Sequence, residues 1–120
     1  MMSSTGFSSL KIYAANTDKV GTKPLYEHIV KLAKEKGLSG ATVYRGIMGF
    51  GSSSRQISMS GFWELTEKLP VVIEIIDRRE KVDDFYSAIE SDLQKMPKGC
   101  LVTIQPVEVR LMKPGKSEQY

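Results

Sequence analysis

The chain has 120 residues, of which 41% are hydrophobic and 26% charged, values typical of one soluble globular domain. Its formal charge of +3 includes no long basic run, so we expect no nucleic-acid partner. The single cysteine, Cys100, excludes an intrachain disulfide and a cysteine-rich zinc site.

The N-terminal residues 1–8 are small and polar, which predicts a disordered leader rather than a secretory signal. No apolar run approaches the roughly 20 residues of a membrane helix, so we expect a cytoplasmic protein. The alternating segment from Leu10 to Ala14 predicts the first strand of a domain that extends over residues 9–113. The polar residues 114–120 predict a flexible tail.

Two helices are predicted from apolar residues at helical spacing. The first follows Pro24 and ends at Gly37, because proline suits a first turn and glycine a C-terminal cap. The second follows Asp77, which together with Glu80 resembles a capping box. The apolar faces consist of Leu25, Ile29, Leu32 and Ala33 in the first helix, and of Val82, Phe85, Ile89, Leu93 and Met96 in the second.

Three further strands are predicted. One covers residues 41–44 and is expected to continue, with a bend, into the glycine-rich segment that ends at Gly51. The apolar run from Val71 to Ile76 predicts a central strand. The last strand is expected between Leu101 and Leu111, at an edge of the sheet, because Pro106 has no N–H to donate.

The element order βαββαβ predicts an α+β, ferredoxin-like fold: a four-stranded antiparallel sheet with two helices on one face. The first and third strands should be central. The uncovered face should carry Tyr13, either Val43 or Tyr44, and alternate residues of the segment 71–76. An apolar uncovered face predicts a closed homo-oligomer.

Catalytic groups are sparse in the sequence. His28 is the only histidine and no nucleophile is evident beside it, and Cys100 is expected to be a small buried residue. Gly115-Lys116-Ser117 imitates the end of a phosphate-binding motif but lacks its first glycine. We therefore expect neither an enzyme nor a metal site.

The segment from Gly46 to Arg55 is the most distinctive feature of the sequence. Its glycines let backbone N–H groups turn toward an anion, and its serine hydroxyls and Arg55 add donors. A flexible hairpin loop would have the same composition, so the composition alone does not distinguish an anion-binding loop from a flexible hairpin. The loop of roughly twenty residues favours function, because loops of that length in compact domains are usually functional or disordered.

The stretch from Tyr44 to Gly51 resembles the PII-like proteins of the domain-of-unknown-function 190 family, in the PII signalling superfamily. Lys23-Pro24-Leu25 and Leu69-Pro70 add to the resemblance, which extends from Leu10 to about Lys113. It implies a homotrimer that binds an adenine nucleotide (ATP, ADP or AMP), or a similar small anionic metabolite, in clefts between subunits. It also implies that the loop after the second strand docks on a target protein, for which a membrane transporter is one candidate.

The resemblance places nucleotide-binding residues at the base of the loop, just before the last strand and within it: Arg45, Gly46, Gly49, Phe50, Gly51, Arg55, Lys98, Gly99 and Arg110. Two features depart from the PII pattern. The segment 95–100 is shorter and poorer in glycine, and three serines precede Arg55. The loop between Phe50 and Leu69 contains no tyrosine, which excludes control by tyrosine modification.

Two other functions are compatible with this topology. An RNA-binding module would need exposed aromatic residues on both central strands, and the segment 71–76 has none. A small hydrolase acting on phosphorylated substrates would need a fixed arginine and a positioned water. Arg45 and Arg55 are available for that role, without an evident partner.

Overall fold

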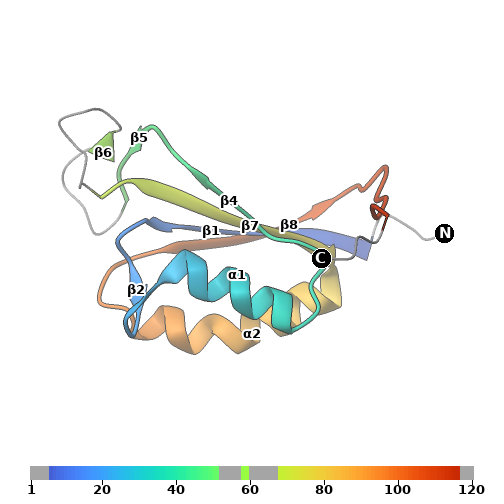
Figure 1. Cartoon of the computed structure of the whole chain (residues 1–120), viewed down its shortest axis with the longest axis horizontal. Coiled ribbons are helices and arrows are strands. Elements are labelled where there is room, and N and C mark those ends of the chain that lie inside the picture. The colour runs from blue at the N-terminus through green and yellow to red at the C-terminus, as the bar shows by residue number, and fades with distance from the viewer. Residues whose placement is uncertain (1–5, 52–57, 60–67, 117–120) are drawn as a thin grey trace.

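The computed structural model describes residues 6–51, 58–59 and 68–116. Both helices cover one face of a four-stranded antiparallel sheet (Figure 1). The strands lie in the order β4 (Thr42–Arg45), β7 (Pro70–Arg78), β1 (Phe7–Ala15) and β8 (Leu101–Val107). The first and third predicted strands are thus central, and Pro106 lies in an edge strand, which confirms the ferredoxin-like prediction.

Helices α1 (Leu25–Glu35) and α2 (Arg79–Lys95) pack their predicted apolar faces on the sheet. The strands contribute alternate residues to the same core because successive side chains in a strand point to opposite faces. Val43 faces this core and Tyr44 faces the other side of the sheet. The buried cluster comprises Leu10, Ile12, Leu25, Ile29, Ala33, Ile73, Ile75, Val82, Phe85, Ile89 and Leu93.

The C-terminal end of α1 has the predicted glycine cap. Gly37 adopts a φ of 80°, its N–H donates to the carbonyl of Lys34 at 3.1 Å, and the N–H of Leu38 donates to Ala33 at 3.0 Å. These two bonds form a Schellman motif, which a residue with a side chain would adopt only with strain. The position of this helix end is therefore encoded locally.

The predicted capping box of α2 is wrong. Strand β7 continues through Asp77 to Arg78, so Asp77 lies inside a strand and no side chain caps α2. The Asp77 carboxylate instead accepts from the backbone N–H groups of Ser39 at 2.8 Å and Arg78 at 2.7 Å. It thereby fastens the connection between α1 and β4 to the end of the central strand.

Two strand boundaries also differ from the prediction. Strand β1 begins at Phe7, so residues 7 and 8 belong to the sheet and not to a leader that ends at residue 8. Ser8 is buried opposite Pro106, where a small side chain fits. Strand β8 ends at Val107 rather than near Leu111, and Val107 pairs with Phe7, the first residue of β1.

Two short hairpins extend the fold at one end of the sheet. Strands β2 (Lys19–Val20) and β3 (Lys23–Pro24) lie between β1 and α1, and Gly21 turns between them with a φ of 62°. Strands β5 (Met48–Gly49) and β6 (Ser58–Met59) pair beyond the ends of β4 and β7 (Figure 1). The predicted continuation of the second strand is thus a separate arm, which begins after a bend at Ile47.

Candidate functional site

The candidate site lies at the end of the sheet where β4 and β1 terminate and β8 begins. Pairing of Arg45 with Val71 and of Ala15 with Pro70 puts the ends of β4 and β1 beside the start of β7. Strand β8 begins opposite Tyr13, so Lys98 and Gly99 reach the same end of the sheet. The predicted residues of the loop base and those before the last strand therefore lie at the same end of the sheet, on its two opposite edges.

Gly46 closes the entry of the long loop against its exit. Its N–H donates to the carbonyl of Pro70 at 2.8 Å. A Cβ on Gly46 would lie 2.9 Å from Cγ of Pro70, closer than real Cβ atoms approach other atoms. Only glycine allows the backbone at position 46 to approach Pro70 this closely. This explains why a glycine stands at the base of the loop.

A second contact, with no signal in the sequence, holds the loop exit. The N–H of Asn16 donates to the carbonyl of Leu69 at 2.9 Å, and Oδ1 of Asn16 accepts from the N–H of Leu69 at 2.8 Å. The two residues are 53 positions apart, and asparagine after a strand usually indicates only a turn. Gly46 and Asn16 thus fix the two sides of the loop base.

The arm that rises from this base exposes apolar side chains. Ile47 is 77% exposed, Phe50 is 74% exposed and Met48 is also exposed. Phe50 therefore lies outside the hydrophobic core that the described residues form. Arg45, Gly49 and Gly51 lie at the same end of the molecule, whereas Arg55 falls outside the described residues.

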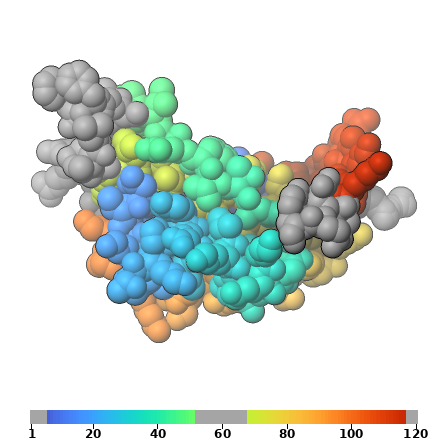
Figure 2. Space-filling model, viewed as in Figure 1, coloured from blue at the N-terminus to red at the C-terminus, as the bar shows by residue number. Residues whose placement is uncertain are grey.

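Arg110 does not join the other predicted site residues within one chain. It follows β8 at the far end of the sheet, where it is exposed and lies 3.8 Å from a carboxylate oxygen of Glu108. The seven residues of β8 separate it from Lys98 by about 20 Å at roughly 3.3 Å per residue. Figure 2 shows the β5 arm (green) and the C-terminal segment (red) at opposite ends of the molecule.

The uncovered sheet face carries a row of apolar residues across all four strands. Tyr44 lies opposite Val72, Val72 opposite Tyr13, and Tyr13 opposite Leu101. Tyr13 is 40%, Tyr44 44% and Leu101 58% exposed. This arrangement confirms that Tyr13, Tyr44 and alternate residues of β7 share the uncovered face.

His28 and Cys100 occupy positions that fit structural roles. Nε2 of His28 lies 3.0 Å from Oδ2 of Asp92, and this contact joins α1 to α2. Burial, with a smaller effect from the Asp18 carboxylate, raises the pKa of the Cys100 thiol. A raised thiol pKa lowers the thiolate fraction and therefore the reactivity. Within residues 6–51, 58–59 and 68–116, no three potential ligand side chains group as a metal site.

The sheet order and the two helices on one face define a protein of the ferredoxin-like class, with a long loop between β4 and β7. The chain belongs to the DUF190 family, described as "Uncharacterized ACR", which matches residues 7–109. A UPF0166 protein of Aquifex aeolicus is 38% identical over 100 residues, covering 83% of this chain and 90% of the relative. A UPF0166 protein of Methanocaldococcus jannaschii is 42% identical over 74 residues, or 62% of this chain and 67% of the relative.

Two solved structures share the fold. CPII from Thiomonas intermedia K12, bound to ADP and bicarbonate, superposes with a TM-score of 0.56 at 16% identity, covering 86% of this chain and 89% of that one. GlnK of B. subtilis, in complex with ATP, gives a TM-score of 0.54 at 14% identity and covers 84% of each chain. Both are PII proteins, which confirms the predicted resemblance at the level of the fold.

Proposed function

We propose that this protein is a regulatory trimer that acts by binding. It takes up an adenine nucleotide, or a similar anionic metabolite, between subunits and presents the loop between β4 and β7 to a target protein. The observation that carries the proposal is the separation of its basic site residues. Lys98 and Arg110 lie at opposite ends of β8 in one chain, so a single site can use both only where two subunits meet.

The uncovered face supplies the surface for assembly. The row from Tyr44 to Leu101 is apolar and crosses the whole sheet, and apolar surface of this kind is removed from water most readily by another copy of the same face. A closed ring of subunits would bury it while leaving the loop end free. The resemblance to the PII-like family implies three as the number of subunits.

The loop base supplies the recognition surface. Arg45 and the backbone from Gly46 to Gly51 would contact the nucleotide, together with Lys98 and Gly99. Phe50 and Ile47, exposed on the arm, would contact the target protein or the ligand, since large exposed apolar residues commonly anchor interfaces. A membrane transporter is a candidate target. In the described part of the chain no helix is long and apolar enough to cross a membrane.

Calorimetry with ATP, ADP, AMP and cyclic nucleotides, with light scattering in parallel, tests the proposal. We expect a trimer mass and saturable binding of at least one nucleotide. Lys98→Ala and Arg110→Ala should each weaken that binding about tenfold, the loss of one charge-assisted hydrogen bond. Arg79→Ala, which removes an equal charge from the start of α2, is the control. If no nucleotide binds, the nucleotide part of the proposal is wrong; a monomer mass would remove the inter-subunit site.

A further inference from the structure

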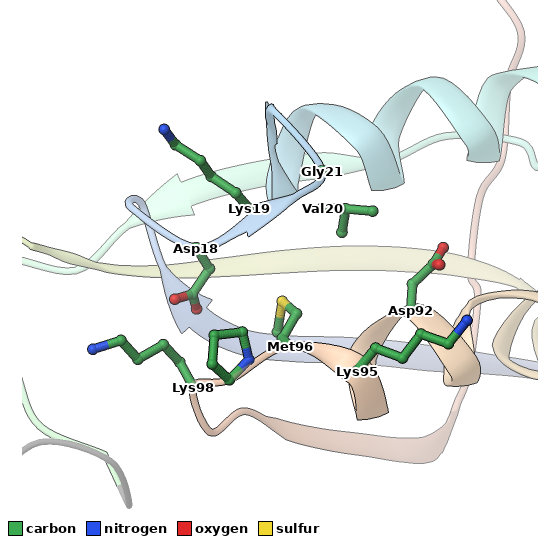
Figure 3. A pocket seen from close by; sticks show the side chains of 9 residues that line it. Asp18, Lys19, Val20, Gly21, Asp92, Lys95, Met96 and Lys98 are labelled. Carbon is green, nitrogen blue, oxygen red and sulfur yellow. The ribbon is translucent and has the colours of Figure 1, made fainter.

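A hollow of about 420 Å³ lies between the β2–β3 hairpin and the C-terminal end of α2 (Figure 3). Its volume falls within the roughly 300–1,000 Å³ of pockets that hold small molecules. Val20 of the hairpin and Met96 at the end of α2 supply apolar surface, and both pack against the hydrophobic core. The floor of the hollow is thus apolar and anchored to rigid parts of the fold.

The rim of the hollow is positively charged. Lys19, Lys95 and Lys98 line it, with Lys19 and Lys98 extending to one side and Lys95 to the other (Figure 3), and within the described ranges none of them forms an ion pair. Lys95 and Lys98 also offset the partial negative charge at the carbonyl end of α2. Their ammonium groups are therefore available to a bound anion.

The two carboxylates that line the hollow have other partners. Oδ2 of Asp18, a buried residue, accepts from the N–H of Ala15 at 2.9 Å. Oδ2 of Asp92 lies 3.0 Å from Nε2 of His28. These contacts fix both carboxylates in place without removing their negative charges, and the three lysines outnumber the two carboxylates, which favours a ligand of negative charge.

We propose that this hollow binds a small organic anion, whose apolar body lies on Val20 and Met96 and whose phosphate or carboxylate meets the lysines. The site also connects to the long loop. Asp18 is bonded to Ala15, and the next residue, Asn16, holds the loop exit at Leu69 through two hydrogen bonds. A ligand that fixes the hairpin therefore favours one position of the loop exit, which makes the hollow an effector site that requires neither a trimer nor a nucleotide.

Amide chemical shifts of the ¹⁵N-labelled full chain, without nucleotide, test the proposal. Phenyl phosphate is titrated against inorganic phosphate, and benzoate against acetate, at constant ionic strength. We expect saturable shifts at residues 18–21, Lys95, Met96 and Lys98, and linked shifts at Asn16 and Leu69. Either phenyl phosphate should bind at least fivefold more tightly than inorganic phosphate, or benzoate at least fivefold more tightly than acetate. The pair that shows this difference identifies phosphate or carboxylate as the charged group of the ligand.

Three variants complete the test. Replacing both lysines in the double variant Lys19→Gln, Lys95→Gln should weaken binding of the aromatic anion at least tenfold, whereas Lys113→Gln, at the far end of the sheet, should leave it unchanged. Val20→Thr should reduce the advantage of the aromatic anion and leave inorganic phosphate unaffected. Shifts that do not saturate, shifts as large around Lys113 as around the hollow, or unchanged binding by the double variant would overturn the proposal.

Discussion

Asn16 and Leu69 form a two-bond contact that joins the end of β1 to the residue before β7. The backbone N–H of Asn16 donates and its side-chain oxygen accepts, so both polar backbone groups of Leu69 are satisfied. Leu69 itself is 5% exposed. The long loop therefore rejoins the sheet through a buried, doubly bonded residue.

Asn16→Ala should lower the free energy of unfolding by about 1 kcal/mol, because the buried N–H of Leu69 loses its acceptor. The amide of Leu69 should then exchange with solvent faster than in the wild type. Urea unfolding and native-state hydrogen exchange measure the two effects. Asn16→Asp keeps an acceptor at the same position and should retain slow exchange; equal exchange at Leu69 in Asn16→Ala and the wild type would contradict the role of this contact.

Gly46→Ala should destabilise the domain by roughly 1–3 kcal/mol, the usual cost of overpacking, since the new Cβ would lie 2.9 Å from the Pro70 ring. The matched control is Gly49→Ala, whose Cβ would lie 3.6 Å from the same ring atom, an ordinary contact. Thermal unfolding of both variants compares them directly. If the two variants unfold at the same temperature, the close approach of Gly46 to Pro70 does not matter for stability.

Asp77→Ala should destabilise the domain by about 2 kcal/mol, because the backbone N–H groups of Ser39 and Arg78 lose a charged acceptor. Ser39→Ala removes only the bond from the Ser39 hydroxyl to the Ile76 carbonyl and should cost less. Asp84→Ala, at an exposed position of α2, should change the unfolding free energy by under about 0.5 kcal/mol. Equal urea midpoints for Asp77→Ala and Asp84→Ala would show that Asp77 does not stabilise the connection between α1 and β4.

The Cys100 thiol should react slowly with alkylating reagents near neutral pH. Burial raises its pKa, so the folded state retains this proton at pH values where the unfolded chain has lost it. The contribution of Cys100 to stability is therefore present below the thiol pKa of the unfolded chain and falls as the pH rises above it. The alkylation rate against pH should have a higher midpoint in the native protein than in urea. A native midpoint at or below that of the denatured chain would be the opposite result.

Tyr13→Arg should convert the proposed oligomer into monomers, because it places an unpaired charge in the middle of the apolar row on the uncovered face. Ser87→Arg adds the same charge on the outer side of α2, where Ser87 is exposed, and should leave assembly unchanged. Light scattering gives the masses and circular dichroism verifies folding. A folded Tyr13→Arg protein with the wild-type mass would place the assembly surface elsewhere.

The order of the elements, the apolar faces of both helices and the cap at Gly37 could be read from the sequence by itself. Each of these depends on residues close together in the chain: alternation in strands, a period of 3.6 in helices and a positive φ at a helix end. The βαββαβ order and the handedness of its crossovers then leave few topologies. For the same reason, the residues of the uncovered face could be predicted from the alternation around Tyr13.

Only the tertiary structure decided which distant polar groups meet. Strand register and helix packing bring three such pairs into contact. They are Asn16 with Leu69, Asp77 with Ser39 rather than with the start of α2, and His28 with Asp92. Local periodicity does not encode such pairs, since each side chain could form a bond of similar strength elsewhere. The separation of Arg110 from Lys98 follows from the extended strand between them, whereas the pairing of β8 with β1 decides that Lys98 lies at the same end of the sheet as the loop base.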